Sequence, residues 1–391
     1  MYKEIRKELF EFSNLNNLSS DELYRLINSL FLKHNKGEYF EPAEKQKIIN
    51  RIYSSIRGLG ILDEMLADDN ICEIMVNSFD EIYMERNGQM ILSEYKFEDE
   101  KELFDVIQRI VGKAGREVNL ANPIVDTRLP GGERVNIVLP PVSLTGALVT
   151  IRRFPHSRIT LENLISLESI TEEAAEFLVG LVKAKYNIFI SGGTSSGKTT
   201  FLNALSDYIP KDERIVTIED SAELQITGVP NLVRMEARNA NTSGTGEITI
   251  RELIKTSLRM RPDRIIVGEV RGAEALDMLN AMNTGHDGSL STGHANSSID
   301  MIYRLETMIL ESGNSFPLLA IRQHIASSID IIVHLTKDGQ GKRRVAEISE
   351  VIGLLDGEVE LSCLYKLQDG KLSKIDKELM HTEKLTLYGK A

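Results

Sequence analysis

The first part of the chain carries apolar residues at helical spacing. One run has them three to four positions apart, at Leu23, Leu26, Ile27, Leu30 and Phe31. This run follows a Ser-x-x-Glu capping box, and its spacing predicts an amphipathic helix. Another helix is expected from Pro42, because proline suits a first helical turn and isoleucines line one face after it. We therefore predict a small helical bundle over residues 1–57.

From about residue 58 the pattern changes to short alternating runs with one helical run among them. The alternating runs predict strands at Cys72–Asn77, Glu81–Arg86, Met90–Tyr95, Val125–Leu129, Arg134–Leu139 and Ala147–Phe154. The pair Asn87-Gly88 predicts a two-residue hairpin between the second and third strands. We predict an α/β domain over residues 58–154, followed by a linker over 155–160 that contains Pro155.

After residue 160, apolar strands alternate with helical runs. Helices are predicted at Glu172–Ala184 and Gly197–Tyr208. Strands are predicted at Asn187–Ser191, Arg214–Ile218, Leu232–Glu236, Arg264–Gly268, Gly288–Thr292, Asp330–Thr336 and Arg344–Val351. Such alternation is typical of a parallel sheet covered by helices on both faces. The predicted fold class is α/β with a parallel-rich sheet, and residues 161–391 form one domain with a C-terminal extension.

The segment that joins the first of these strands to its helix carries candidate chemistry. It consists of Gly192, Gly193, Thr194, Ser195, Ser196, Gly197, Lys198, Thr199 and Thr200. The segment fits Gly-x-x-x-x-Gly-Lys-Ser/Thr, in which backbone N–H groups surround a phosphate. Lys198 would reach the β- and γ-phosphates, and the Thr199 hydroxyl would ligate Mg²⁺. The alternative is a glycine-rich turn with a chance lysine. The strand before the segment and the helix after it favour a nucleoside triphosphate site.

Two strand-end glutamates are candidates for the attacking water. Glu219 ends one apolar strand and Glu269 follows another. Because ligands of open parallel sheets bind beyond the carboxyl ends of the strands, both should face the phosphate loop. Gly268 stands where a metal-associated aspartate is usual, so the glutamates would act on Mg²⁺ through water. Glu269 is the first choice for polarising the nucleophile. Either glutamate could instead be a solvated strand-end carboxylate.

Histidines and arginines complete the candidate set. His286 and His294 flank a Gly/Ser/Thr-rich strand, at a separation that fits no common metal site. On chemistry alone, a structural role is the better interpretation for each histidine. Charge on the γ-phosphoryl oxygens calls for arginines, and Arg134, Arg152, Arg153 and Arg271 are candidates. An isolated surface arginine is often only solvated.

Composition narrows the classes of function. The net charge of −12 argues against a broad nucleic-acid or anionic-lipid surface. Cys72 and Cys363 form no Cys-x-x-Cys pair, so neither a disulfide framework nor a zinc site is expected. No apolar run approaches the roughly 18 residues of a membrane span. The N-terminus lacks a secretory signal pattern. These features together favour a cytoplasmic protein.

With these residues in place, the chain resembles the type II/type IV secretion ATPase superfamily, and most of all its tight-adherence (Flp-type) pilus-assembly branch. The matching segments are Gly192–Thr200, the acidic box Thr217–Leu224, Gly246–Arg251, Leu258–Gly272, the histidine box Met282–Asn296 and, upstream, Gly60–Arg86 and Gly132–Phe154. The resemblance spans roughly residues 58–355. A strand that ends in Gly-Glu is the pattern of this superfamily, so the missing aspartate is not a defect.

The resemblance implies a RecA-like motor domain after a PAS-like domain, assembled as a ring that is usually a homo-hexamer. It implies that ATP and Mg²⁺ are used, that Glu269 is the catalytic carboxylate and that Glu219 belongs to the acidic box. His286 and His294 would then sense or position phosphates, and Arg134 and Arg152 would reach the nucleotide. The implied partner is an inner-membrane platform protein of a pilus or secretion system, at the cytoplasmic face of the membrane.

The leading hypothesis is a ring ATPase that drives pilus assembly or secretion. A nucleic-acid translocase with the same core is the main alternative, and strong stimulation of ATP hydrolysis by DNA or RNA would favour it. A small-molecule kinase would transfer phosphate to a metabolite, but the sequence offers no acceptor lid. A nucleotide-gated scaffold would bind ATP without releasing phosphate.

Overall fold

A computed structural model describes residues 1–12, 15–35, 37–86, 88–153, 158–238, 240, 245–313, 316–339 and 341–389. The chain divides into two compact units, Met1–Ser157 (unit 1) and Arg158–Ala391 (unit 2). Asn87 of the predicted hairpin and residues 155–157 of the predicted linker lie outside the described residues. The predicted domain boundaries at residues 57 and 160 stay predictions.

Unit 1 begins with helices whose apolar faces meet one another. They are α1 (Tyr2–Phe10), α2 (Ser20–His34) and α3 (Pro42–Arg57), with a 3-10 turn at Leu15–Asn17 after α1. The predicted capping box is present, since Ser19 and Glu22 exchange side-chain to backbone hydrogen bonds. Ile5, Leu23, Ile27 and Ile52 are fully buried in the cluster that these helices share.

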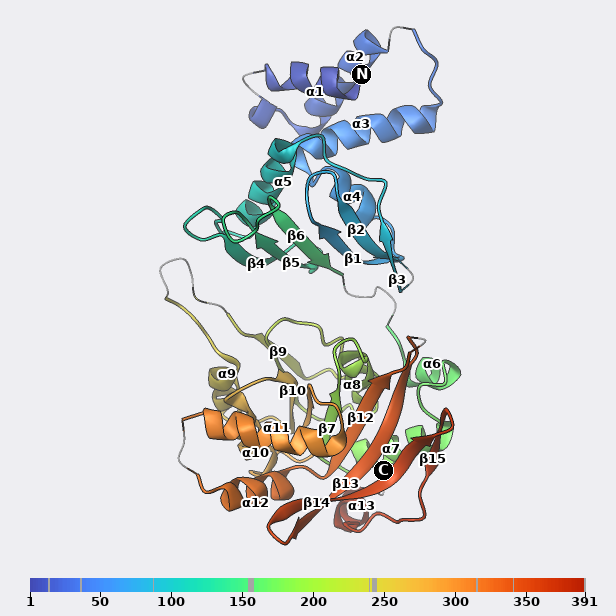
Figure 1. The fold of residues 1–391 in the computed structure, drawn as a ribbon, viewed down its shortest axis with the longest axis vertical. Helices are drawn as coiled ribbons and strands as arrows, with labels where there is room; N and C mark the ends of the chain where they lie inside the picture. Colours follow the sequence, from blue (N-terminus) through green and yellow to red (C-terminus); the bar gives the residue numbers. More distant parts are fainter. Residues whose placement is uncertain are drawn as a thin grey trace. The chain divides into compact units, whose positions relative to one another are not determined.

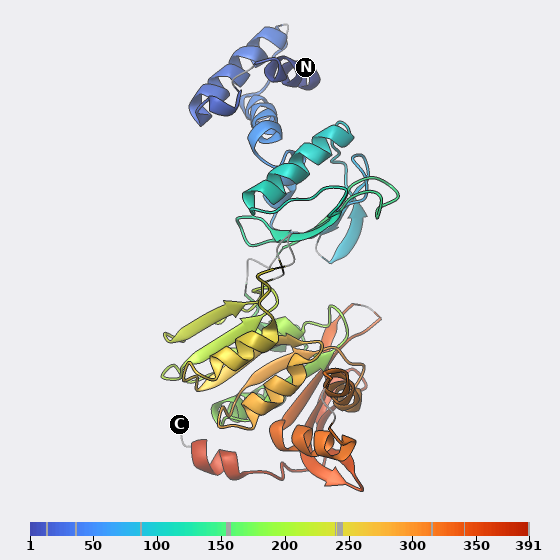
Figure 2. The same ribbon diagram turned by 90° about the vertical axis from the view of Figure 1, so that its left-hand side faces the viewer.

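The rest of unit 1 is an antiparallel sheet covered by a helix. Its strands are β1 (Ile71–Val76), β2 (Ile82–Arg86), β3 (Gln89–Leu92), β4 (Ile124–Arg128), β5 (Arg134–Val138) and β6 (Leu148–Arg152). They lie in the order β3-β2-β1-β6-β5-β4. The helix α4 (Ile61–Leu66) precedes β1, and α5 (Glu100–Lys113) lies across one face of the sheet (Figure 2). Val106, Ile107 and Ile110 of α5 are buried in the core beneath it.

Unit 2 contains one mixed sheet (Figure 1). Its strands are β7 (Ile188–Gly192), β8 (Ile215–Glu219), β9 (Leu232–Glu236), β10 (Arg264–Val270), β11 (Leu290–Gly293), β12 (Ile331–Lys337), β13 (Arg343–Leu355), β14 (Glu358–Gln368) and β15 (Lys371–Lys374). Their order is β15-β14-β13-β12-β7-β11-β10-β8-β9. The pairs from β12 to β9 are parallel, as predicted. The pairs from β12 to β15 are antiparallel, so the sheet is mixed, with its parallel part from β12 to β9.

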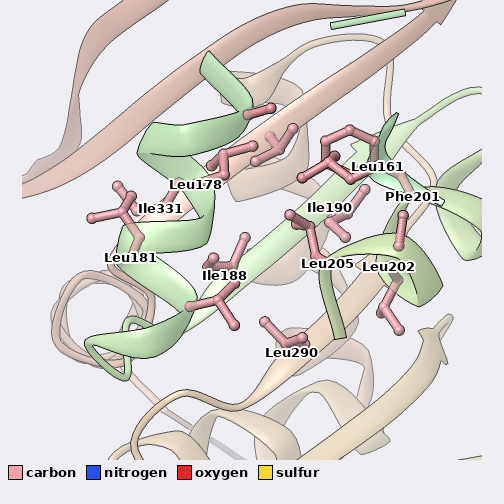
Figure 3. Close-up of a cluster of buried hydrophobic side chains, with 14 of the residues drawn as sticks. Leu161, Leu178, Leu181, Ile188, Ile190, Phe201, Leu202, Leu205, Leu290 and Ile331 are labelled. Carbon is pink, nitrogen blue, oxygen red and sulfur yellow. The ribbon is translucent and has the colours of Figure 1, made fainter. Parts of the chain in front are cut away.

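Helices cover both faces of this sheet. On one face lie α6 (Leu161–Ser166), α7 (Glu172–Lys183) and α8 (Lys198–Ser206); on the other lie α9 (Ile250–Ser257), α10 (Glu274–Met282), α11 (Ser298–Glu311) and α12 (Leu318–Ser328). Ile188 and Ile190 of β7 point to the first face and Phe189 points to the second. Figure 3 shows Ile188 and Ile190 packed among Leu178, Leu181 and Leu205. This alternation with burial on both sides explains the continuous apolar character of the central strands.

Both ends of unit 2 are attached to its helices and strands. Arg158 donates to the carbonyl of Asn203 (3.2 Å) and pairs with Asp207, so it is fixed to the C-terminal end of α8. The tail ends in α13 (Glu383–Tyr388), where Lys384 Nζ lies 2.7 Å from a carboxylate oxygen of Asp330 and 2.8 Å from one of Asp287. Within the described ranges, the chain forms no helix of the length and apolarity needed to cross a bilayer.

Candidate functional site

The predicted phosphate loop lies at the carboxyl end of β7, in the strand–loop–helix setting that the motif requires. Gly197 has a left-handed φ of +94° and caps α8, which begins at Lys198. Gly192 must be glycine, because a Cβ there would lie 2.6 Å from the Leu335 carbonyl oxygen. Ser195 also adopts a left-handed φ, +58°. The backbone of the loop therefore adopts a conformation that needs glycine at Gly192 and Gly197.

Lys198 is the buried cation of the loop, with 7% of its surface exposed. Its Nζ donates to the carbonyl oxygens of Gly192 (3.1 Å) and Gly193 (3.0 Å). It also lies 3.2 Å from Nδ1 of His294. Burial lowers the pKa of Lys198, against an opposing contribution from the Glu269 carboxylate. The charged ammonium is thus short of solvent, which favours any anion that reaches it.

His294 and Arg271 hold the Glu269 carboxylate between them. Nε2 of His294 lies 2.7 Å from one Glu269 oxygen, and Nη2 of Arg271 lies 2.6 Å from the other. Burial and the neighbouring Lys198 lower the pKa of His294. A neutral imidazole can accept from Lys198 at Nδ1. Its Nε2 lies close to the Glu269 oxygen without meeting the geometry of a hydrogen bond. Lys198, His294, Glu269 and Arg271 therefore form a continuous polar chain beside the loop.

Glu219 is buried next to this chain, with 3% of its surface exposed. One carboxylate oxygen accepts from the backbone N–H groups of Glu223 (2.6 Å) and Leu224 (2.7 Å). The other oxygen is buried and has no hydrogen-bond partner. Burial raises the pKa of Glu219 despite these two bonds. The side chain also accounts for Gly268, where a Cβ would come within 3.0 Å of Glu219 Cγ.

A cleft of about 700 Å³ opens beside the loop and the polar chain. Gly193, Thr194, Arg271 and His294 line one side, and Tyr303 and Arg304 of α11 line the other. In the described part of the chain, no three His, Cys, Asp or Glu side chains are grouped to hold a metal ion. The Thr199 hydroxyl and the Glu219 oxygen without a hydrogen-bond partner are nevertheless possible oxygen ligands. Oxygen ligands of this kind suit a hydrated Mg²⁺.

Among the predicted residues, His286 does not lie at the loop within unit 2, and Arg134, Arg152 and Arg153 belong to unit 1. His286 precedes β11, whose first residue Leu290 is paired with Ile188 at the start of β7. His286 therefore lies near the amino ends of these parallel strands, whereas the loop lies at the carboxyl end of β7. Its Nδ1 lies 3.2 Å from the Ala281 carbonyl oxygen. Arg134 and Arg152 belong to unit 1, where they are direct cross-strand partners on β5 and β6. Arg128 of β4 pairs with Arg134 and extends the row to three arginines.

Two residues at the loop were not predicted from the sequence. Nδ1 of His334 on β12 lies 2.8 Å from Oγ of Ser191, and Arg343 at the start of β13 donates from Nε to the Ser195 carbonyl oxygen (2.9 Å). A histidine inside the apolar run 330–336 was a usable signal, because buried polar groups need a partner. For Arg343 the sequence offered no signal beyond its charge.

Comparison with known proteins shows the family to which the chain belongs. The model of the family described as "Type II/IV secretion system protein" matches residues 56–372. The chain belongs to this family. A putative conjugal transfer protein of Mycobacterium tuberculosis is 35% identical over 325 residues, which cover 82% of this chain and 91% of the relative. The type IV secretion system protein PtlH of Bordetella pertussis is 36% identical over 258 residues, covering 60% of this chain and 76% of PtlH.

The fold has a counterpart among solved structures. The X-ray structure of the Legionella pneumophila ATPase DotB superposes with a TM-score of 0.53 at 22% identity, covering 73% of this chain and 78% of that one. At this identity the likeness concerns the fold alone. Membership of the type II/IV secretion family, together with the phosphate loop, identifies this chain as an ATPase of a type II/IV secretion system.

Proposed function

We propose that this family member is a ring-forming motor, a homo-hexamer, that couples ATP hydrolysis to pilus assembly or protein secretion. Unit 2 would be its RecA-like motor domain, and residues 58–154 its PAS-like domain. It would work at the cytoplasmic face of the membrane with an inner-membrane platform protein, and the tight-adherence branch is the subgroup proposed. The observation that carries the proposal is the polar chain from Lys198 through His294 to Glu269, beside the phosphate loop.

The loop would bind the triphosphate through its N–H groups and Lys198. A phosphate placed there replaces the Gly192 and Gly193 carbonyls as partner of the ammonium, and a charge-assisted bond to phosphate is the stronger one. Mg²⁺, when bound, would neutralise charge on the β- and γ-phosphates. Thr199 would hold it directly, and Glu269 and Glu219 through water.

Glu269 would polarise the attacking water. Arg271 holds one oxygen of this carboxylate and His294 lies close to the other, which restricts its orientation, so little reorganisation is needed during the reaction. The sequence predicts that Arg271 contacts the γ-phosphate. Its 2.6 Å contact with Glu269 supports a positioning role instead. The proposed source of transition-state cations is then Arg134 and Arg152, with Arg128 beside them in the same cross-strand row. The family resemblance also assigns His286 to a phosphate, but within unit 2 this residue lies away from the loop, so we assign it no part at the loop of its own chain.

The decisive experiment measures phosphate release and nucleotide binding by the full chain. Lys198→Ala should abolish both, because the buried cation of the loop is gone. Glu269→Gln should lower turnover by ~10²–10⁴-fold, as expected on loss of a general base, while ATP still binds. Glu236→Gln is the matched control, because it changes another strand-end glutamate on the edge strand β9. Full turnover by Glu269→Gln would overturn the assignment.

A nucleic-acid translocase remains the alternative, because the Mycobacterium relative is named for conjugal transfer. The net charge of −12 argues against it. Adding DNA or RNA to the same phosphate-release assay decides the matter, since a translocase is strongly stimulated and the proposed motor is not. Mass measurement in solution with an ATP analogue tests the ring, and a strict monomer under all conditions would contradict it.

A further inference from the structure

The strands β12 and β13 support the phosphate loop from outside at three successive points. Nδ1 of His334 lies 2.8 Å from Oγ of Ser191. The Leu335 carbonyl oxygen lies where it would clash with a side chain at Gly192. Arg343, directly paired with Lys337 across the two strands, reaches the Ser195 carbonyl oxygen at 2.9 Å. The first two contacts fix where the loop leaves β7. Only the third touches the part of the loop that arches over the bound phosphates in this motif.

Ser195 is the point in the loop that most needs support. Its φ of +58° is a left-handed conformation, which is unfavourable for residues other than glycine. The residue is exposed, so packing does not impose this conformation. The Arg343 side chain spans the same stretch, because a Cβ on Gly197 would lie only 3.4 Å from Arg343 Cδ. Arg343 therefore lies along the outer side of residues 195–197 and bonds to the strained residue.

Peptide geometry links this bond to phosphate binding. The Ser195 C=O and the Ser196 N–H belong to one planar trans peptide and point in opposite directions. Holding the carbonyl outward aims the N–H into the loop, where backbone donors form the anion nest. In the structure the Ser196 N–H makes one long bond, 3.4 Å to the Gly193 carbonyl, which a phosphate oxygen would readily replace.

We propose that Arg343 is a positioning residue for ATP, which sets the phosphate loop in its receiving conformation by holding the Ser195 carbonyl. This inference rests on the proposed ATPase function. Arg343 acts through the loop backbone and does not itself need to touch the nucleotide. Its loss should weaken nucleotide binding, because the free loop then loses order that binding must restore. Hydrolysis of the ATP that does bind should proceed normally, since the bound phosphates hold the loop.

Three variants of the full chain separate a hydrogen bond from a charge. Arg343→Met keeps a long stem across Gly197 and removes the donor. Arg343→Gln places an uncharged N–H at the same number of bonds from Cα as the arginine Nε. Lys342→Ala is the control, because it removes the neighbouring cation, which lies 3.6 Å from Glu168 and is not bonded to the loop. For each, KM and kcat for ATP, Kd for ADP and Tm are measured.

Arg343→Met should raise KM for ATP and Kd for ADP about tenfold, the usual effect of losing a hydrogen bond from a charged group. Its kcat should stay close to that of the unaltered protein. Arg343→Gln should recover most of the affinity, and Lys342→Ala should change nothing.

Unchanged KM and Kd in Arg343→Met would overturn the proposal, whether or not Tm falls. It would equally fail if Arg343→Gln bound as weakly as Arg343→Met, because the charge alone would then matter. If the unaltered chain released no phosphate, the ATPase proposal would fail by itself, and the ADP affinities would still decide the role of Arg343.

Discussion

At the scale of single residues, Gly268 explains how this site manages without the usual strand-end aspartate. The side chain of Glu219 on the neighbouring strand lies over Gly268, so that a Cβ there would approach Glu219 Cγ to 3.0 Å. One oxygen of this Glu219 carboxylate is buried and has no hydrogen-bond partner. The carboxylate is thus supplied by β8, and the glycine leaves room for it.

Gly268→Ala should therefore lower ATP turnover and destabilise the protein by about 1–3 kcal/mol, as overpacking of a tight interior does. The methyl group displaces Glu219 from the N–H groups of Glu223 and Leu224. Gly180→Ala in α7 is the contrast, because its Cβ would meet nothing within 4 Å. It should stabilise the helix by roughly 0.5–1 kcal/mol. Urea unfolding of both variants checks the signs, and a Gly268→Ala protein as stable and active as its parent would contradict the packing argument.

The sequence predicts where a side chain lies when that side chain directly follows a strand. Lys198 and Glu269 follow strands that the apolar pattern predicts, so their shared edge of the sheet could be inferred. His286 shows the limit of this reasoning, because spacing from a strand does not reveal at which end of the strand a residue lies. Arg343 and His334 reach the loop across the sheet, and their sequence separation from it, 148 and 143 residues from their partners, conceals the contact.

At the scale of secondary-structure elements, the apolar pattern predicted the central strands but not the last two. The strands β14 and β15 each follow an Asp-Gly pair, Asp356-Gly357 and Asp369-Gly370, in which both residues have positive φ. Asp-Gly is a strong hairpin signal, so both strands could have been predicted. The antiparallel edge was missed because the alternation of helices and strands was extended past the point where it stops.

A buried ion pair joins β10 to the loop before β8. Arg264 is fully buried, donates to both carboxylate oxygens of Glu213 and also reaches the Val182 carbonyl (2.7 Å). Arg264→Met should cost about 3–5 kcal/mol, because the buried Glu213 carboxylate then keeps only the longer contact with Lys185, whose Nζ lies 3.7 Å away. Adding Glu213→Leu should recover part of this loss.

Urea unfolding of the single and double variants measures both effects. The exposed pair Lys374–Glu378 serves as control, and Lys374→Ala should change stability by less than about 1 kcal/mol. A double variant less stable than Arg264→Met would show that the Glu213 carboxylate, left without Arg264, is not the source of the lost stability.

At the scale of the whole molecule, three buried or half-buried histidines should make the free energy of unfolding depend on pH. Burial lowers the pKa of His294, His324 and His334, all in unit 2. Below their unfolded pKa of about 6.5, the unfolded chain binds more protons than the folded one. The free energy of unfolding should therefore fall as pH falls from about 7.5 toward 5.5. Buried carboxylates with raised pKa, such as Asp330, act in the opposite direction at lower pH.

His334→Gln isolates the histidine contribution, because the carboxylates are common to both proteins. The variant should lose less stability than its parent as pH falls over that range, and urea unfolding at a series of pH values measures the difference. Parallel curves for the two proteins would show that His334 does not titrate with unfolding.

The helix α8 has a mechanical consequence for a motor of this kind. Its nine residues span about 14 Å. The phosphate cradle occupies its first turn, and Arg158 is tied to its last, where the polypeptide passes into unit 2. One helix thus connects the phosphate loop to the segment where the chain enters unit 2. A shift of α8 along its axis would therefore move the phosphate loop and Arg158 together, without first displacing the sheet.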